Sequence, residues 1–474
     1  MTRDIPDLTA AELHAAIATR AVSCVEVMNA HLDRIEAVNP AHNAIVALRP
    51  RDSLLAQARE HDDQIARGEP VGPLHGFPHA VKDLSWVRGI PSTSGSPILE
   101  DFVPSQDSLH VARMRAAGAI FIGMTNTPEF GLGSHTYNGV YGTTRNAFDL
   151  SRSAGGSSGG AAVALARGMV PLADGSDFGG SLRNPAGWNN VVGFRPSIGV
   201  VPSESRDAWL PGMGVIGPMA RNVSDLARLL AVQAGYDPRA PLSQLGDGGR
   251  FRAPLDIDLR GRRIAWVGDF DGFTPCEPGV LDLCRAALKT FEDRGAVVEE
   301  AVPDHPLEPV WRALLTLRAF QAGFGLLDFY DDPARRALLK PEIVFEVEAG
   351  KALSAFDVAA ASLVRTAWSA AVGRFLGRYD ALVVPTAQVF PFPVEEAWPR
   401  EIGGVAMTTY HEWMKANFLI TMSGCPSLAV PAGFNAQGLA IGLQIVTPVH
   451  HDVAALQLGR AYERARGPLS PGRR

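Results

Sequence analysis

Two glycine-rich segments carry the serines most suited to chemistry in this chain. Residues 155–160 read GGSSGG and include Ser157, and residues 175–187 read GSDFGGSLRNPAG and include Ser181. A serine hydroxyl becomes a nucleophile when a base removes its proton. Glycine has no Cβ, so several backbone N–H groups of such a segment can converge on one developing negative charge. The pattern therefore predicts a serine nucleophile beside an oxyanion-binding loop.

The base that would activate this serine is not an obvious histidine. All twelve histidines lie outside residues 136–304, and none stands in a triad-like motif, although a distant histidine could still fold inward. Lys82 is the better candidate, because it lies in an apolar segment, residues 77–84, that is typical of a buried strand. Burial lowers the pKa of a lysine and gives a neutral amine that can accept a proton. The alternative is a structural ion pair of Lys82 with Asp83 or with a distant carboxylate.

The composition disfavours several classes of function. The chain has 474 residues, 46% of them hydrophobic, and a formal net charge of −6, which disfavours a nucleic-acid-binding surface. Its apolar runs are too short for a membrane span, and its first residues lack the apolar core of a secretory signal. The four cysteines are scattered, and His75 and His79 are separated by Pro78, so no helix would present both rings to a metal. We expect a cytoplasmic protein with no metal, nucleic-acid or membrane partner.

The elements that must position these residues alternate between helices and strands. Capping boxes at Thr9–Glu12 and Ser23–Glu26 predict two N-terminal helices. Apolar runs and helical periodicity predict strands at 44–48, 77–84, 120–124, 263–267, 296–300, 381–385, 427–430 and 441–446, and helices at 52–66, 111–117, 158–166, 224–234, 280–293, 306–330, 355–377 and 452–464. Residues 235–260 are the clearest loop. This alternation predicts an α/β fold with a central sheet, and one large domain rather than two.

Several motifs together resemble those of the amidase signature family. The two glycine–serine segments and VVGFRPS at 191–197 resemble its signature, and Lys82 stands in a segment that is similar to the family's lysine strand. Further blocks extend the resemblance over most of the chain: TNTPEF at 125–130, GCPS at 424–427 and GLAIGLQ at 438–444. The resemblance implies a large central mixed β-sheet covered on both faces by α-helices. It implies a single domain, 1–474, with a signature core at about 70–202 and a less typical region at about 235–420 that would shape the substrate pocket.

The resemblance also implies a Ser–cis-Ser–Lys triad. Ser181 would be the nucleophile, Ser157 the proton relay and Lys82 the general base, with a cis peptide bond before Ser157. The oxyanion would be held by backbone N–H groups, those of Phe178, Gly179, Gly180 and Ser181. By family position, the residues that would support this set are Ser158, Ser176, Asp177 and Arg183. No cofactor is implied.

A substrate pocket is expected beside the triad. Gly131, Leu132 and Gly133 fall where family members line the acyl site, and their small size suggests room for a bulky group. Trp188 could supply an apolar wall, although core packing is the alternative role for it. The usual signature residues are replaced at Ser176, Asn184, Asn189, Asn190 and Arg195. We therefore expect an active enzyme with an atypical pocket.

The leading prediction is a free-standing amidase that acts on neutral, fairly hydrophobic amides. The resemblance is to broad-specificity amidases, aryl acylamidases and urethanases, so anilides, carbamates and esters are candidate small-molecule substrates, and a monomer or homodimer is expected. One alternative is the catalytic A-type subunit of a tRNA-dependent amidotransferase, but no charged set suited to an aminoacyl-tRNA carboxylate is visible. A non-catalytic binding relative is the other alternative, against which the intact Lys82, Ser157 and Ser181 argue.

Overall fold

A computed structural model describes residues 4–210 and 212–470 of the chain. Its largest sheet consists of eight strands: β6 (Ala173–Asp177), β7 (Val192–Arg195), β8 (Val215–Ala220), β9 (Arg263–Trp266), β10 (Val297–Glu300), β11 (Ala381–Pro385), β14 (Ser427–Phe434) and β15 (Ala440–Val446). Their order in the sheet is β10-β9-β11-β15-β14-β7-β8-β6. The pairs β10–β9 and β9–β11 are parallel and the other neighbours antiparallel, so the expected mixed sheet is confirmed.

A second, smaller sheet carries Lys82. It consists of β1 (Ile45–Val46), β2 (Pro78–Lys82) and β3 (Ile120–Thr125), and β3 lies in the middle. All residues of β2 and β3 are buried, which explains their nearly continuous apolar sequences. Two short hairpins complete the strands: β4 (Tyr137–Asn138) with β5 (Gly142–Thr143), and β12 (Glu401–Ile402) with β13 (Val405–Ala406).

The two N-terminal helices begin where their capping residues predict them. Both N-terminal capping boxes form as expected, at Thr9–Glu12 and at Ser23–Glu26. The helices are α1 (Ala10–Ala18), α2 (Cys24–His42), α3 (Arg51–Ala66), α4 (Leu109–Ala116), α5 (Gly159–Ala166), α6 (Asn184–Trp188), α7 (Val223–Gln233), α8 (Val280–Glu292), α9 (Leu307–Tyr330), α10 (Pro333–Arg336), α11 (Pro341–Lys351), α12 (Ala355–Leu376), α13 (Lys415–Ser423) and α14 (Asp452–Arg466).

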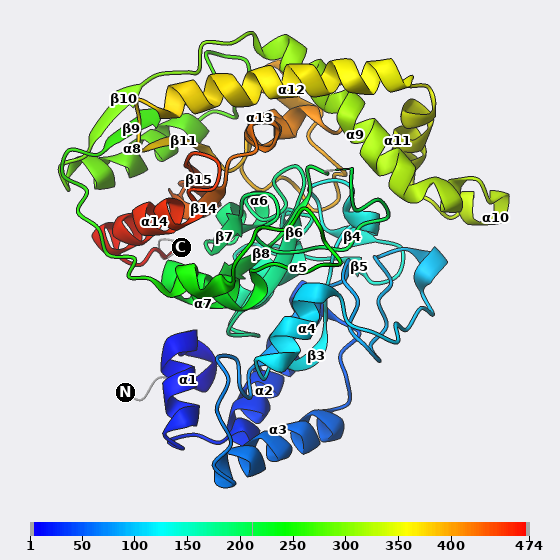
Figure 1. Ribbon diagram of the computed structural model, residues 1–474, viewed down its shortest axis with the longest axis vertical. Helices are drawn as coiled ribbons and strands as arrows, with labels where there is room; N and C mark the ends of the chain where they lie inside the picture. The colour runs from blue at the N-terminus through cyan, green and yellow to red at the C-terminus, as the bar shows by residue number, and fades with distance from the viewer. Residues whose placement is uncertain (1–3, 211, 471–474) are drawn as a thin grey trace.

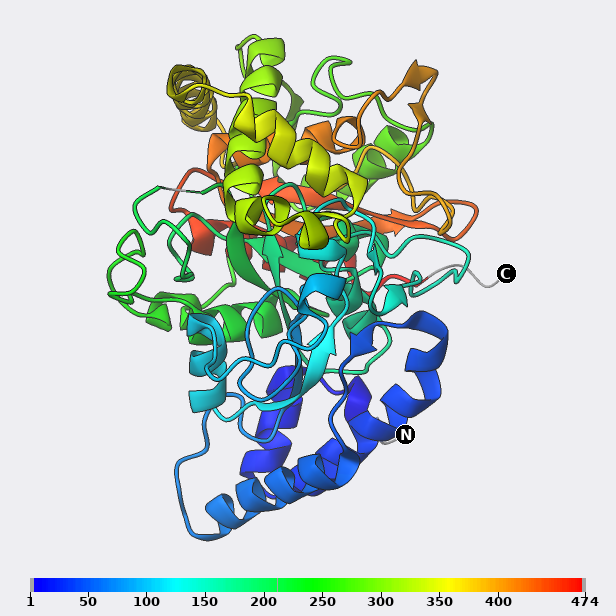
Figure 2. The same ribbon diagram turned by 90° about the vertical axis from the view of Figure 1, so that its right-hand side faces the viewer.

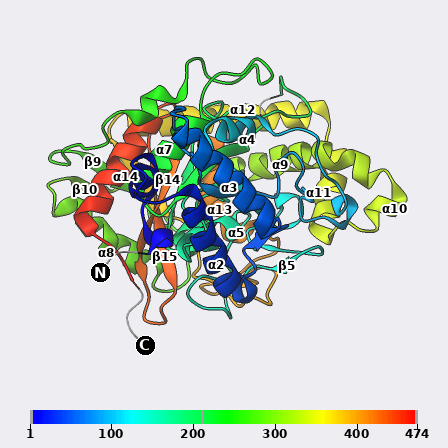
Figure 3. The same ribbon diagram turned by 90° about the horizontal axis from the view of Figure 1, so that it is seen from below.

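Helices cover both faces of the large sheet (Figure 1). On one face α7, α8 and α14 pack against the strands and against one another, and on the other face α5 and α6 do so. The N-terminal helices α1, α2 and α3 form one end of the long axis, with the large sheet in the middle and α9 to α12 at the opposite end (Figure 2). Figure 3, seen from below, shows α2 and α3 across the near end of the molecule.

The two sheets meet where the candidate site lies. Strand β2 of the small sheet packs against β6 of the large sheet, and α5 contacts both. The close approach of α5 requires glycine, because a Cβ on Gly160 would lie 2.4 Å from the backbone nitrogen of Asn126. This junction brings the end of β2, which carries Lys82, next to the serines of the signature segments.

Several elements have no counterpart among the predicted ones. Among them are β6, β7, β8, α6, α11 and α13. Strand β6 reads ADGSD and α6 has only five residues, so neither has the apolar run or the periodicity that predicts an element. The strand predicted at 44–48 shortens to Ile45–Val46. Among the described residues, no helix combines the length and apolar character needed to cross a membrane.

Candidate active site

Lys82 lies at the end of β2 with only 1% of its surface exposed. Its Nζ is 2.7 Å from Ser157 Oγ, 2.9 Å from Ser158 Oγ and 3.0 Å from Ser176 Oγ. A charged ammonium would donate to all three oxygens, whereas a neutral amine has a lone pair that can accept a hydrogen from one of them. The amine is therefore held among hydroxyl groups that suit both of its protonation states.

Burial lowers the pKa of Lys82 to about 7, because it penalises the ammonium, and the carboxylates of Asp177 and Asp174 oppose this shift. A lysine with this pKa is largely neutral slightly above pH 7 and can act as a base there. The alternative ion pair with Asp83 does not form. The Asp83 carboxylate instead accepts hydrogen bonds from the backbone and hydroxyl of Thr93, at 2.8 and 2.6 Å.

Ser157 is placed by a glycine pair whose backbone few other residues could adopt. The peptide bond between Gly156 and Ser157 is cis. Gly155 has a φ of +73°, and a Cβ there would lie 2.4 Å from Asn184 Oδ1. The Thr136 hydroxyl donates to the Gly155 carbonyl at 2.7 Å and holds this turn. The glycine pair before Ser157 thus allows the backbone conformation that places the Ser157 side chain.

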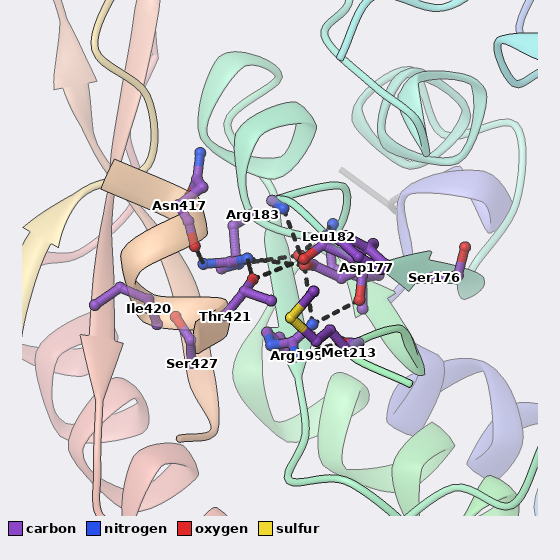
Figure 4. Close-up of polar contacts among 12 residues, drawn as sticks. Ser176, Asp177, Leu182, Arg183, Arg195, Met213, Asn417, Ile420, Thr421 and Ser427 are labelled. Carbon is purple, nitrogen blue, oxygen red and sulfur yellow. Dashed lines mark hydrogen bonds and ion pairs between the residues drawn. The ribbon is translucent and has the colours of Figure 1, made fainter. Parts of the chain in front are cut away.

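Asp177 organises the loop that follows β6, and Figure 4 shows its polar contacts with Arg183 and Arg195. Its buried carboxylate accepts hydrogen bonds from Arg183 at 2.9 and 2.8 Å and from Arg195 at 3.2 Å. Burial opposes this charge, but Arg183 and Arg195 outweigh the effect and hold the pKa of Asp177 well below its usual range. The carboxylate also accepts the backbone N–H of Gly180 at 3.0 Å. One ion pair network therefore fixes the turn that carries the serine.

The carbonyl groups of this loop are held on one side. Arg195 donates to the carbonyl of Asp177 at 2.6 Å, and the Thr421 hydroxyl donates to the carbonyl of Phe178 at 2.7 Å. A trans peptide places its N–H opposite its C=O. The N–H groups of Phe178 and Gly179 therefore point away from Arg195 and Thr421.

The expected oxyanion donors divide into two groups. The N–H groups of Phe178, Gly179 and Ser181 have no hydrogen-bond partner within the described ranges, so they are available to an anion. Gly180 differs from the expectation, because its N–H donates to Asp177 where the chain turns with a φ of +112°. The N–H of Gly180 thus holds the turn, and the other three donors remain.

Helix α13 packs directly on this loop and explains two of its glycines. A Cβ on Gly179 would lie 2.4 Å from the ring of Phe418. A Cβ on Gly180 would lie 2.6 Å from the side chain of Asn417. Both neighbours are buried side chains of α13. The chain can approach α13 this closely only without a side chain.

A cavity of about 500 Å³ opens beside the loop, and both Ser157 and Ser181 line it. Ser181 is 7% exposed, and no hydrogen bond joins its hydroxyl to that of Ser157 in the described structure. The walls are mostly apolar and include Leu84, Trp86, Leu109, Phe130, Phe178 and Ile216. A hydrophobic group of moderate size would be buried in this cavity next to both hydroxyls.

The predicted substrate-binding residues are only partly brought together. Gly131 lines the cavity. Leu132 packs in a small apolar cluster with residues of α9 and α11, and a Cβ on Gly133 would face Lys340 at 4.0 Å. Trp188 is fully buried and stacks on Trp413, with 5.8 Å between ring centroids, so it is a core residue and not a wall of this cavity.

Other residues of the cavity carry no signal in the sequence. Trp86, His110 and Glu204 line the cavity, yet none belongs to a recognised motif. They come from the loop after β2, the first turn of α4 and the segment before β8. Their contribution depends on how these distant segments fold together, which no local pattern encodes.

The histidines with metal-like spacing point to different partners. His75 Nε2 lies 3.0 Å from the carbonyl of His61, whereas His79 Nε2 lies 2.9 Å from Asp174 Oδ1. In the part of the chain that the structure describes, no group of three or more histidine, cysteine, aspartate or glutamate side chains is arranged to hold a metal ion.

Comparisons with known proteins all indicate the same family. The model of the Amidase family matches residues 26–456. An acylamidase of Rhodococcus erythropolis is 36% identical over 462 residues, which cover 97% of this chain and 95% of that protein. The A-type subunit of the glutamyl-tRNA(Gln) amidotransferase of Salinispora tropica is also 36% identical, covering 99% of both chains. The crystal structure of a bacterial aryl acylamidase of the amidase signature family superposes with a TM-score of 0.90 and 31% identity, covering 97% of this chain and 96% of that one.

Proposed function

Because this chain belongs to the amidase family and is a hydrolase of amide bonds, we propose that it cleaves them through a covalent acyl-enzyme on Ser181. The observation that carries this proposal is the contact between Lys82 Nζ and Ser157 Oγ at 2.7 Å, at the edge of a cavity that Ser181 also lines. A buried amine, a bridging hydroxyl and a second hydroxyl are the parts that a serine nucleophile needs.

In the acylation step, neutral Lys82 accepts the hydroxyl proton of Ser157, and Ser157 accepts the proton of Ser181. Ser181 Oγ forms a bond to the amide carbon while the carbonyl electron pair moves to oxygen. When the carbonyl re-forms, the C–N bond breaks and Ser157 gives its proton to the leaving nitrogen. Lys82 then returns its proton to Ser157. A short relay suits amides, because their nitrogen must be protonated before it can leave.

The oxyanion would be stabilised by the free N–H groups of Phe178, Gly179 and Ser181. Removing one such donor typically raises the barrier by about 3 kcal/mol. Arg195 and Thr421 already hold the carbonyls of this loop, so the donors need no reorganisation when the charge develops. In the second step water forms a bond to the acyl carbon and gives a proton to Ser157, whose own proton passes to Lys82. The C–O bond to Ser181 then breaks and the acid leaves, while Ser181 Oγ takes a proton back from Ser157, and Lys82 returns its proton to Ser157.

We propose neutral, fairly hydrophobic amides as substrates, with anilides first and carbamates and esters as further candidates. The apolar walls of the cavity support this class, and no arginine or lysine is among its described lining residues. Two carboxylates do line it, Asp177, which its arginines neutralise, and Glu204. A substrate carboxylate would find no counter-charge there. The names of the acylamidase and aryl acylamidase relatives agree with this range.

The alternative is the A-type subunit of a tRNA-dependent amidotransferase. The amidotransferase relative and the acylamidase have the same identity of 36%, so identity does not separate the two functions. The bond chemistry would be the same, but activity would depend on partner proteins. The lack of a cationic residue in the described cavity lining favours the free-standing amidase.

The test is an assay of the purified chain alone. We expect it to hydrolyse 4-nitroacetanilide, and to hydrolyse a succinyl anilide, which adds a carboxylate, at least about tenfold more slowly in kcat/KM. Ser181→Ala should abolish turnover, whereas Ser158→Ala should leave a reduced rate, because the Ser158 hydroxyl supports the base, which it contacts together with the carbonyl of Ser176. Inertness of the chain alone, with glutamine hydrolysis appearing when the other components of an amidotransferase are added, would favour the alternative.

A further inference from the structure

A second buried carboxylate, Asp174, lies beside Lys82 and has no part in the steps above. Asp174 belongs to β6 and is 1% exposed. Its Oδ1 is 2.9 Å from His79 Nε2, and its Oδ2 is 3.4 Å from the backbone nitrogen of Lys82 and 3.6 Å from His110 Nε2. An ionised carboxylate can only accept, so the facing nitrogen of His79 must carry a hydrogen. Asp174 therefore joins two histidines to the strand of the lysine.

Strand geometry explains why one segment of β6 serves both groups. Asp174 and Ser176 are two residues apart, so their side chains lie on the same face of the strand. Ser176 meets the amine of Lys82, and Asp174 meets the imidazole of His79 on the same strand as Lys82. The two contacts fix the end of β2 against β6.

His110 connects this cluster to the substrate cavity. It is fully buried, yet it lines the cavity from the first turn of α4. Its Nε2 faces Asp174 at 3.6 Å, and neither ring nitrogen has a hydrogen-bond partner within the described ranges. Because no hydrogen bond fixes this imidazole, its electrostatic environment changes whenever a nearby group gains or loses charge.

The charges around Lys82 can be counted element by element. From β6 come Asp174 and Asp177, and the charge of Asp177 is balanced by Arg183 and Arg195. The other groups that face the amine are the hydroxyls of Ser157, Ser158 and Ser176. From β2 and α4 come the two imidazoles, His79 and His110, and both face Asp174. Asp174 is thus an anion near Lys82 that no arginine or lysine side chain neutralises within the described ranges. Asp83, the residue after Lys82, is another, and its carboxylate is held by Thr93.

We propose that Asp174 is a positioning residue for Lys82: together with His79 and His110 it fixes the charge that the buried amine faces, and so sets the pH above which Lys82 works as a base. The inference rests on the proposed function in one respect, the role of Lys82. When Lys82 takes the proton of Ser157, the carboxylate of Asp174 stabilises the new ammonium. The hydrogen bond from His79 and the nearby ring of His110 keep that stabilisation small enough for the proton to leave again.

The first test compares the pH dependence of kcat/KM in Asp174→Asn and in wild type. Losing the anion disfavours the ammonium, so the acid limb of the profile should move to lower pH by about one pH unit. His79→Gln keeps the carboxylate and a donor at the same place, so its acid limb should not move to lower pH. Equal downward shifts in both variants, or no shift in Asp174→Asn, would overturn the inference. Asp225→Asn removes a buried carboxylate that instead caps α1 at Ala10, and it should leave the limb in place.

The second test needs no activity and no Asp174 variant. In histidine-labelled wild-type protein, the C2–H resonances of His79 and His110 should show a step with pH that reports the protonation of Lys82, because Asp174 couples them to Lys82. Lys82→Met should remove that step. Persistence of the step in Lys82→Met, or its absence in wild type, would overturn the inference. His411, which bonds Glu346 instead, is the internal control.

The two tests separate this inference from the proposed function. If the chain hydrolyses no amide but Lys82→Met still removes the histidine step, the cluster is coupled to Lys82 and only the proposed function fails. If Lys82→Ala abolishes hydrolysis while Asp174→Asn keeps the wild-type acid limb, the function stands and the role of Asp174 is refuted.

Discussion

Lys82 is buried with no carboxylate at hydrogen-bond distance from its amine among the described residues. Its side-chain contacts are hydroxyl and carbonyl oxygens, and the carboxylate of Asp177 is held by two arginines. A lysine in this position loses the hydration of its charge and receives only partial compensation. The residue is therefore kept near neutrality at a cost to the stability of the fold.

Replacing Lys82 by methionine should show this cost. The folded-state pKa of Lys82 is about 7 and its ordinary value is 10.5, so between these values the unfolded chain binds more protons than the folded one. The free energy of unfolding of the wild type should therefore rise with pH by about 1.4 kcal/mol per pH unit from this group, between about pH 7 and 10. Lys82→Met has no amine that titrates at this position, so its free energy of unfolding relative to wild type should fall steadily between about pH 7 and 10. Urea unfolding across pH measures the difference, and a constant difference would contradict the burial argument.

Gly180 should not tolerate a side chain. Gly180→Ala would place a Cβ 2.6 Å from Asn417 at a φ of +112°, so the loop must move and the oxyanion donors with it. We expect kcat to fall by about 10²-fold or more, as for the loss of a donor. Gly261→Ala is the matched control, because Gly261 also has a positive φ, +76°, but nothing lies within 4 Å of its Cβ position. It should lower stability without changing kcat. Similar rates for both variants would argue against the loop geometry.

The sequence predicts single residues unevenly. Lys82, Ser157 and Ser181 stand in motifs, and the structure brings the first two into contact. The direction of the Gly180 N–H depends on how the loop packs against α13, and the burial of Trp188 depends on its contact with Trp413. No local sequence pattern encodes either of these long-range contacts. Side-chain type at a given spacing predicts chemistry better than it predicts exposure.

At the scale of elements, a side chain of α9 that is bonded to α11 packs against Phe178 of the oxyanion loop. Arg318 of α9 lies over the ring of Phe178, at 5.2 Å from its centroid. Its guanidinium bonds Glu346 of α11 at 2.7 Å and the Tyr410 hydroxyl at 2.9 Å. The same glutamate accepts from His411 at 2.7 Å. This buried cluster joins the less typical region of the chain to the wall of the cavity.

Glu346→Gln tests the cluster. Burial opposes the charge of Glu346, but Arg318 outweighs it and lowers the pKa to about 2 from an ordinary 4.5. The charge therefore contributes stability above pH 4.5 that is lost as the pH falls toward 2. The variant should be about 3 kcal/mol less stable at pH 7, because Arg318 loses its partner, and the gap should close between pH 4.5 and 2. Glu348→Gln, an exposed neighbour on α11, should change stability by less than about 0.5 kcal/mol. An equal loss in both variants would contradict the role of burial.

Elements with a strong period are predictable from the sequence and short polar ones are not. The long helices α9 and α12 and the buried strands β2 and β3 lie close to their predicted ranges. Strand β6 is not predicted, since its sequence ADGSD has no apolar alternation and its place in the sheet comes from pairing with β8. The strand that carries Asp174, Ser176 and Asp177 is thus one that local propensity describes poorly.

At the scale of the whole molecule, the site lies where two sheets meet. Lys82 comes from the small sheet, Ser157 from the turn just before α5, and Ser181 from the loop after β6 of the large sheet. Relative movement of the two sheets would separate the Lys82 amine from the serines. The packing of β2 against β6 therefore holds the catalytic groups together. The sequence predicts an α/β fold and its family. The junction of the two sheets forms by packing between residues far apart in the chain, so the sequence does not predict it. None of the described residues that line the cavity belongs to the region at about 235–420, so a role of that region in substrate selection stays a prediction.

The most direct measurement of the central claim is the site of acylation. The chain is mixed with 4-nitrophenyl butyrate, an ester whose acyl-enzyme can accumulate, and is quenched in acid within the first turnover. Peptide mass spectrometry then locates the butyryl group. We predict that it lies on Ser181, that Ser181→Ala removes it, and that Lys82→Ala slows its formation while leaving the same site. A butyryl group on Ser157 or on another residue, or turnover without any acylated peptide, would contradict the account.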